Sequence, residues 1–395
     1  MILYNLDNEI SKRDYIYAFL LLCVSGNPFF PAVFTEWIFV GFAFIIFLCH
    51  MRTISEDEIN KVSFRYWFVG FIILFIAQYM FISPVSIPAD INFLARLSIA
   101  FIIPSILGEK FRYAYLRAIT FTAAVSLILF AAYYFSGWHT GIKIGRNYSI
   151  MIYNQLLLSD GARNSGMFWE PGAFQGYINL VPLMFFNDLK LLWNQERLSC
   201  IILFLALITT FSTTGYVVFM FIIGTALVIK TNNNLLKIVV SVFIVASVIY
   251  SFNSFDFIGE KINHDYEIAL KVKEGKASWS RFGAAVVDSY EIARSPITGN
   301  GFMMDARYPK LGKQMAGSGN GFTGAVNVFG IVVIFFYLLQ LYRRAPGESK
   351  SDHLIYVVAV VLLLQGEFFL NYPMFWALLF VLYPQHYSES IETEN

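Results

Sequence analysis

Long apolar runs separated by polar connections extend along almost the whole chain. A helix needs about 20 predominantly apolar residues to cross the hydrocarbon core of a bilayer. The pattern therefore predicts an all-α, polytopic transmembrane protein of about twelve spans, with residues 1–395 forming a single integral membrane domain. Three runs are short, so ten to twelve spans fit the pattern. The runs lie at 14–31, 33–50, 64–83, 91–108, 113–135, 171–187, 198–212, 214–230, 235–252, 320–342, 354–370 and 373–384.

The composition fits a protein whose main solvent is lipid. Hydrophobic residues make up 57% of the chain and charged residues only 14%, whereas a soluble domain carries about 25% charged residues. The net charge of +1 gives no basis for nucleic-acid binding. The three cysteines all lie inside apolar runs, without disulfide or metal-ligand spacing, so we interpret them as packing residues.

The short connections predict the orientation. Those after even-numbered runs carry Lys and Arg, whereas Asn27–Pro31, Ser83–Asp90 and Asn371–Pro373 on the other side carry neither. Basic residues gather in cytoplasmic loops. Both termini are therefore predicted to be cytoplasmic.

Two long loops, residues 136–170 and 253–319, fall on the outer side and are nevertheless basic. We expect them to be extracytoplasmic and to contain short helices. Long loops are largely exempt from the charge rule, so the orientation stands. Ordinary loop composition explains the charge, but clustered basic residues would also attract phosphate or an acidic sugar. An outward-facing anion site is the alternative.

The first candidate motif closes the first long loop and runs from Arg163 to Gly172, through Gly166, Glu170 and Pro171. Proline suits the first turn of a helix, so Pro171 predicts that a helix begins there. A carboxylate just before it is favoured by the helix dipole. Glu170 therefore has two interpretations. It is a residue that only starts the helix, or it acts at the outer membrane surface as a general base or as a ligand of the acceptor sugar.

The second motif lies in the second long loop. Arg281 begins an expected amphipathic helix at the membrane surface, with Phe282, Val286, Tyr290 and Ala293 on its apolar face. A glycine-rich stretch, Pro296-Ile-Thr-Gly-Asn-Gly, follows. Its glycines either form turns or allow close backbone approach to a ligand.

Several polar residues at the outer ends of runs have two interpretations. The stretch 212–215, Ser-Thr-Thr-Gly, is expected to be a tight turn whose hydroxyls cap the next span. Arg96 lies within an apolar run. A charged residue inside a membrane span usually has a function, but the long arginine side chain can also extend to the lipid headgroups. Glu36 and Glu367 are interpreted as solvated edge residues.

These stretches, in this order, resemble the O-antigen polymerase and ligase family of bacterial envelope glycosyltransferases, and most closely its polymerase (Wzy-type) branch. The first block, Arg-x-x-Gly-x-x-x-Glu-Pro, is matched by Arg163, Gly166, Glu170 and Pro171. The second, Arg followed by Pro-x-x-Gly-x-Gly, is matched by Arg281, Pro296, Gly299 and Gly301. The third is matched by Gly319-Asn320. The resemblance covers roughly residues 140–342.

One departure separates the chain from the ligase branch. Ligases have a histidine where this sequence has Gly319. A base at that position is therefore missing, which counts against a ligase and leaves Glu170 as the better candidate.

The resemblance implies a metal-independent, inverting glycosyltransferase that acts without a cofactor on undecaprenyl-diphosphate-linked oligosaccharide at the periplasmic face of the bacterial inner membrane. The outer loops hold no Asp-x-Asp metal motif, and arginine can neutralise a diphosphate instead. The implied diphosphate ligands are Arg163, Arg281, Arg307 and Arg96, and the catalytic residues are Glu170, Arg163 and Arg281. Trp169, Trp279 and Asn320 are candidate glycan contacts, and the two tryptophans are otherwise ordinary interfacial residues.

Two other functions remain as alternatives. A ligase would transfer the glycan to lipid A core. A flippase or transporter of lipid-linked sugars would carry charges along a transmembrane path, whereas here the charges gather in the outer loops. Besides the bilayer and the lipid-linked substrate, a chain-length regulator is left open as a partner.

Overall fold

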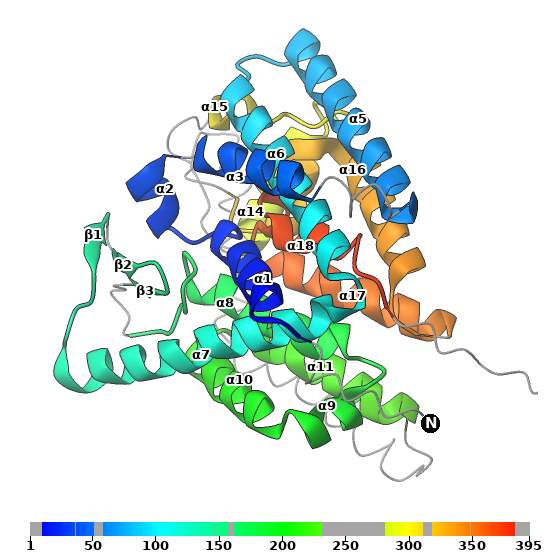
Figure 1. Ribbon diagram of the computed structural model, residues 1–395. Helices are drawn as coiled ribbons and strands as arrows, with labels where there is room; N and C mark the ends of the chain where they lie inside the picture. Colours follow the sequence, from blue (N-terminus) through cyan, green and yellow to red (C-terminus); the bar gives the residue numbers. More distant parts are fainter. Residues whose placement is uncertain are drawn as a thin grey trace, which may run out of the picture.

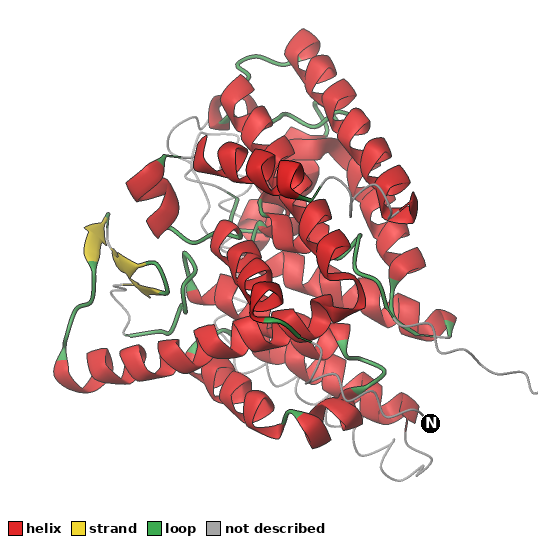
Figure 2. Ribbon diagram, viewed as in Figure 1, coloured by secondary structure: helices red, strands yellow, loops and turns green. Residues whose placement is uncertain are grey.

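A computed structural model describes residues 10–35, 37–50, 58–145, 147–156, 162–230, 281–310, 318–347 and 349–383 (Figure 1). Nearly all of the regular structure in this part of the chain is helical (Figure 2). The α-helices are α1 (Lys12–Val24), α2 (Phe29–Phe34), α3 (Trp37–Cys49), α5 (Glu58–Phe81), α6 (Ile87–Leu107), α7 (Phe111–Ser136), α8 (Pro171–Met184), α9 (Leu189–Gln195), α10 (Arg197–Thr209), α11 (Thr213–Lys230), α14 (Arg281–Ile292), α15 (Met304–Arg307), α16 (Gly321–Arg344), α17 (Lys350–Gly366) and α18 (Pro373–Ala377).

Several helices are long and apolar enough to cross a membrane. Three meet this description in the described residues: Asn60–Phe81, Ile87–Ser136 and Gly321–Arg344. A fourth is added if α9 and α10, bent by 105° at their junction, are counted as one span. The chain is thus a mostly helical protein with apolar spans. The count of twelve stays a prediction, and the run 235–252 lies outside the described residues.

Two predicted runs are interrupted in the structure. The run 14–31 is divided into α1 and α2, because Gly26 adopts a left-handed φ of 100° and ends the first helical course. The last run, 373–384, forms only the short helix α18 within the described residues. The apolar composition predicted each segment as a continuous span and gave no sign of these breaks.

The first long loop contains strands in place of the expected short helices. β1 (Ile142–Ile144), β2 (Asn147–Ile150) and β3 (Tyr153–Leu156) form an antiparallel sheet in the order β1-β2-β3. The strands are joined by tight turns, the first containing Gly145 at a φ of 59°. In Figure 1 the sheet stands at the edge of the helical body, beyond the end of α7.

The second long loop is described only in part, but its glycine-rich stretch has a clear place. α16 is broken at Gly330, where φ is 82° and ψ is 163°. The stretch packs backbone to backbone into this break. The amide N–H of Gly301 donates to Val328 O at 3.1 Å, and that of Ile331 donates to Pro296 O at 2.8 Å. The glycines of this stretch therefore allow its backbone to approach the helix α16 closely.

An aromatic core lies where α5, α6, α16 and α18 meet. Phe71, Phe93, Phe329 and Trp376 contact one another with ring centroids 4.7 to 6.1 Å apart, mostly in edge-to-face geometry. Such pairs stabilise a fold by about 0.5–1.5 kcal/mol beyond their burial. The core fixes α16 and the chain that follows α17, which together carry part of the candidate site.

Candidate active site

The segment leading to α8 is fixed from three sides. The backbone N–H of Asn154, on β3, donates to Gly166 O at 2.7 Å. The Asn164 side chain donates to Ser126 Oγ on α7 at 3.1 Å and to Thr209 Oγ1 on α10 at 3.0 Å. The start of α8 therefore has a defined position relative to the sheet and two helices.

Glu170 is drawn into a carboxyl pair at this helix start. It is the residue before the first turn of α8, yet its side chain makes no capping hydrogen bond. Instead it accepts from Trp169 Nε1 at 3.1 Å and is hydrogen-bonded to the side chain of Glu367, which follows the last residue of α17. Gly172 makes room, because a Cβ there would lie only 2.2 Å from Glu367 Oε1.

Arg281 brings a positive charge to the pair. Its Nη1 donates to Thr214 Oγ1 at 2.6 Å, and its Nη2 lies 3.9 Å from Glu367 Oε1. The Arg281 side chain is 45% exposed and that of Glu367 only 14%. A half-exposed ion pair at this distance adds little to stability. The guanidinium has five N–H donors, so it is suited to bind an anion that arrives from outside.

Several helices begin around these side chains. A Cβ at Gly321, the first residue of α16, would overlap Glu367 O. Gly366 packs against Thr214 in the first turn of α11, with its ideal Cβ 3.4 Å from Thr214 Cγ2. The helix α8 contributes its first turn through Gly172, and Arg281 is the first described residue of α14. Helix N-termini carry partial positive charge, so their convergence favours bound anions.

A buried amide lies one turn deeper in α8. Gln175 is fully buried, and its Nε2 has no hydrogen-bond partner among the described residues. This nitrogen lies 3.5 Å from the position of a Cβ at Gly366, while Gln175 Oε1 accepts from Asn179 at 3.1 Å. The site thus has an unused donor at its base, which the motif analysis did not single out.

The two carboxyl groups have different environments. Burial raises the pKa of Glu367 well above its ordinary value, and the adjoining Glu170 raises it further through a hydrogen bond and its charge, while Arg281 opposes the rise. Burial therefore favours the protonated form of Glu367, the form that can donate the hydrogen bond to Glu170.

Glu367 corrects one sequence interpretation. The residue was expected to be a solvated edge side chain, but it is largely buried and forms the centre of the cluster. Its position at the end of an apolar run was the available signal. Nothing in the sequence near Glu367 indicates that it meets Glu170, almost two hundred residues earlier.

Arg163 holds a neighbouring turn. Its Nε donates to Thr210 O at 3.0 Å, and its Nη2 donates to Phe211 O at 2.8 Å. Phe211 has a left-handed φ of 48°, which is unfavourable for a residue with a side chain. Arg163 thus stabilises the turn before α11, whose Thr214 contacts Arg281. Its predicted role in binding diphosphate stays a prediction.

Arg307 lies deeper in the fold than expected of a loop residue. It is 2% exposed, donates from Nη2 to Tyr308 OH at 3.2 Å, and has its guanidinium 5.7 Å from the ring centre of Phe368. Phe368 is the residue after Glu367. Arg307 therefore borders the site from behind, next to Asp288.

Asp288 organises this region. The carboxylate is fully buried and accepts from Tyr308 OH, Ser318 Oγ and Thr323 Oγ1 at 2.6 Å each, and from Asn327 Nδ2 at 3.3 Å. It lies on the packed face of α14, with Ala284 and Val287. Tyr290, on the face expected to lie against the membrane, is 49% exposed. Arg281 is the first described residue of this helix, so its predicted start stays a prediction.

Arg96 and Trp169 line a cavity of about 370 Å³. Arg96 donates to Asn371 O at 3.0 Å, and its guanidinium lies 5.4 Å from the ring centre of Tyr372. Trp169 stacks on the same tyrosine ring at 4.5 Å. The Trp169 indole therefore contacts the carboxyl pair through its Nε1 and also lines this cavity.

Asn320 has a structural role in addition to its predicted contact with glycan. Its Oδ1 accepts from the N–H groups of Phe322 and Thr323 at 3.1 Å, which caps α16. Its Nδ2 donates to Gln365 Oε1 at 2.6 Å, which ties the start of α16 to the end of α17. Trp279 lies outside the described residues.

The described residues contain no group of three His, Cys, Asp or Glu side chains placed to hold a metal ion. No protein-family model matches the chain, and no curated protein matches it either. The chemistry therefore has to be argued from the site itself. A proton acceptor, a guanidinium and several helix N-termini meet in one place, which is the combination required to deprotonate a hydroxyl and stabilise an anionic leaving group.

Proposed function

We propose that the protein is a membrane glycosyltransferase that joins oligosaccharide repeat units carried on undecaprenyl diphosphate, at the periplasmic face of the bacterial inner membrane. The observation that carries the proposal is the cluster of Glu170, Glu367 and Arg281 at the meeting point of helix N-termini. The motif resemblance supplies the substrate class. The apolar helices are compatible with a lipid-linked substrate.

The reaction uses these groups in an inverting displacement. Glu170 accepts the proton of an acceptor hydroxyl, whose oxygen forms a bond to the anomeric carbon of the donor sugar. The bond between that carbon and the phosphate oxygen breaks, and the electron pair leaves with the lipid diphosphate. Arg281 pairs with the departing phosphate, because guanidinium remains charged and matches phosphate geometry.

Glu367 keeps the pair in its working state. Its proton forms the hydrogen bond to Glu170, and its burial excludes a second negative charge beside the diphosphate. Two adjacent carboxylates do not both ionise readily. One carboxylate therefore remains as base, close to an anionic substrate that would otherwise repel it.

The test compares two arginines of similar exposure near opposite ends of α14. Arg281 and Arg294 are each 45% exposed, but Arg294 pairs with Glu291 at 2.6 Å, away from the carboxyl pair. Arg281→Ala is expected to lower polymerisation roughly 10²–10³-fold, the cost of removing one preorganised donor. Arg294→Ala is expected to keep full activity.

The assay is a gel of envelope glycans from strains in which each variant replaces the native gene. With Arg281→Ala, surface lipid carrying a single repeat unit is expected, and full-length polymer would refute the role of Arg281. Deletion of the gene separates the rival functions. Long polymer retained on undecaprenyl diphosphate would indicate a ligase, and single units trapped on the cytoplasmic face would indicate a flippase.

A further inference from the structure

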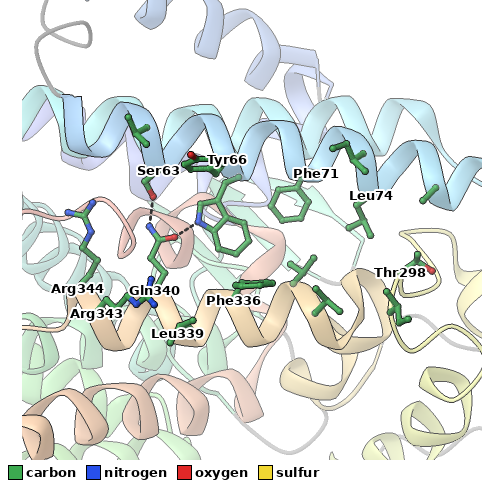
Figure 3. A pocket seen from close by; sticks show the side chains of 18 residues that line it. Ser63, Tyr66, Phe71, Leu74, Thr298, Phe336, Leu339, Gln340, Arg343 and Arg344 are labelled. Atoms are coloured by element: carbon green, nitrogen blue, oxygen red, sulfur yellow. Dashed lines mark hydrogen bonds between the residues drawn. The ribbon is translucent and has the colours of Figure 1, made fainter.

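A second, larger cavity lies between α5 and α16, away from the carboxyl pair. It has a volume of about 690 Å³ and almost wholly apolar walls (Figure 3). Tyr66, Phe71 and Leu74 line it from α5, and Phe336 and Leu339 line it from α16. Figure 3 shows the two helices running along its opposite sides. The cavity is therefore an elongated groove for an apolar chain.

Polar contacts hold the groove at both ends. Near one end, Gln340 of α16 accepts from Trp67 Nε1 and donates to Ser63 Oγ on α5 (Figure 3). Near the other end, Gln78 of α5 donates to Thr298 O at 2.6 Å and to Val328 O at 2.9 Å. These contacts fix the separation of the helices, so the space between them is preformed.

The groove is apolar along its length and positively charged at one end. Arg343 and Arg344, in the last turn of α16, line the end near Gln340, whereas Thr298 lines the other (Figure 3). An apolar slot that ends in two guanidinium groups is complementary to a hydrocarbon chain with an anionic head.

The charged end lies far from the candidate active site. Gly321, which packs against Glu367, lies before the break of α16 at Gly330. After the break, α16 continues from residue 331 to Arg344, 14 residues or about 21 Å, which is more than half of a bilayer core of roughly 30 Å. With the connection after Arg344 predicted on the cytoplasmic side, a lipid with its head at Arg343 lies in the leaflet opposite to the site. A substrate that reacts beside Glu170 would carry its phosphates at the wrong end.

We propose that this groove binds an anionic phospholipid, with its phosphate at Arg343 and Arg344 and an acyl chain between α5 and α16. Arginine pairs with phosphate through two parallel hydrogen bonds. The acyl chain covers apolar side chains that α5 and α16 leave uncovered.

Trp67 in the groove wall gives a direct measurement. Purified protein is placed in nanodiscs of unlabelled phosphatidylcholine with increasing fractions of brominated phosphatidylglycerol or brominated phosphatidylcholine with identical chains. Bromine quenches tryptophan fluorescence on contact, and the signal of Trp67 is the difference between the native protein and Trp67→Phe. We expect brominated phosphatidylglycerol to quench Trp67 at a roughly 30-fold lower lipid fraction than brominated phosphatidylcholine does. This factor corresponds to about 1 kcal/mol of binding free energy for each of the two arginines.

Two pairs of variants separate the effect of the positive charge at the end of the groove from the effect of the space inside it. The Arg343→Gln, Arg344→Gln double variant is expected to abolish the preference, while Arg65→Gln, an exposed arginine on α5 outside the groove, keeps it. Gly70 lines the groove, and a Cβ there meets nothing within 4 Å. Gly70→Leu should therefore fill the groove and reduce Trp67 quenching by both lipids.

The control for space is Gly41→Leu, which adds the same side chain on α3, where a Cβ also meets nothing within 4 Å. It is expected to leave Trp67 quenching unchanged. Equal quenching of the native protein by the two lipids would overturn the proposal, as would undiminished quenching in Gly70→Leu. If the double arginine variant does not fold, the comparison of the two lipids in the native protein and the Gly70→Leu result still test the proposal.

Discussion

Replacing Gly172 with alanine should separate activity from stability. An alanine Cβ would lie 2.2 Å from Glu367 Oε1 and 3.0 Å from its Cδ, where ordinary contacts begin near 3.4 Å. The carboxyl group must therefore move by roughly 1 Å, and misplacement of that size can cost about 10²-fold in rate. The carboxyl is the end of a side chain, so it can rotate away. Alanine is also favoured over glycine in a helix by up to about 1 kcal/mol.

We therefore expect Gly172→Ala to fold with a stability within about 1 kcal/mol of the native protein and to polymerise roughly 10²-fold more slowly. The rate is measured with purified protein and lipid-linked repeat units, and the melting temperature in the same detergent. Gly41→Ala is the control, since a Cβ there meets nothing within 4 Å. An unchanged rate in folded Gly172→Ala would refute the catalytic role of the carboxyl pair.

Four further variants test other parts of the structure. Asp288→Ala leaves four donors without their acceptor, two of them, Tyr308 and Asn327, fully buried, so a loss of about 3 kcal/mol or more in unfolding free energy is expected by thermal melting. Gly330→Ala places a Cβ 2.0 Å from a carbonyl oxygen at a φ of 82°, and should destabilise the break in α16 by a similar amount. Arg163→Ala removes two hydrogen bonds to carbonyls and should lower the melting temperature more than Arg281→Ala does. Burial raises the pKa of Glu367 in the folded protein, so the stabilising contribution of this residue is complete below its unfolded pKa and is lost as the pH rises through the folded pKa. Over that pH range the melting temperature of the native protein should fall relative to that of Glu367→Gln. Parallel curves of melting temperature against pH would contradict the pairing.

The sequence was informative about helices that are continuous and apolar. Long apolar runs predicted α5, α6 and α7, because burial in lipid imposes composition on every residue of a span. The sequence also predicted the start of α8, because Pro171 is a local signal. It missed the sheet in the first long loop, whose strands are only three or four residues long.

Interruptions were harder to predict than elements. The break at Gly330 and the end of α1 at Gly26 depend on backbone conformations that only tertiary contacts select. The motif glycines at 299 and 301 were interpreted from the sequence as turns or as places of close approach to a ligand. They instead allow one backbone to pack into the break of another, which no local pattern distinguishes from a turn.

The site was only partly predictable for a related reason. Glu170 and Arg281 could be proposed because each lies in a motif block, in a loop predicted to face outward. Their connection could not, because it runs through Glu367, a residue that an apolar run made look peripheral. Helices that begin together create a positive electrostatic field, and a carboxyl placed in that field remains buried only if it keeps its proton or has a cationic partner. Glu367 has both, through Glu170 and Arg281. The proton that makes the burial of Glu367 tolerable also forms its hydrogen bond to Glu170, so the stability of the cluster and its proposed chemistry depend on one proton.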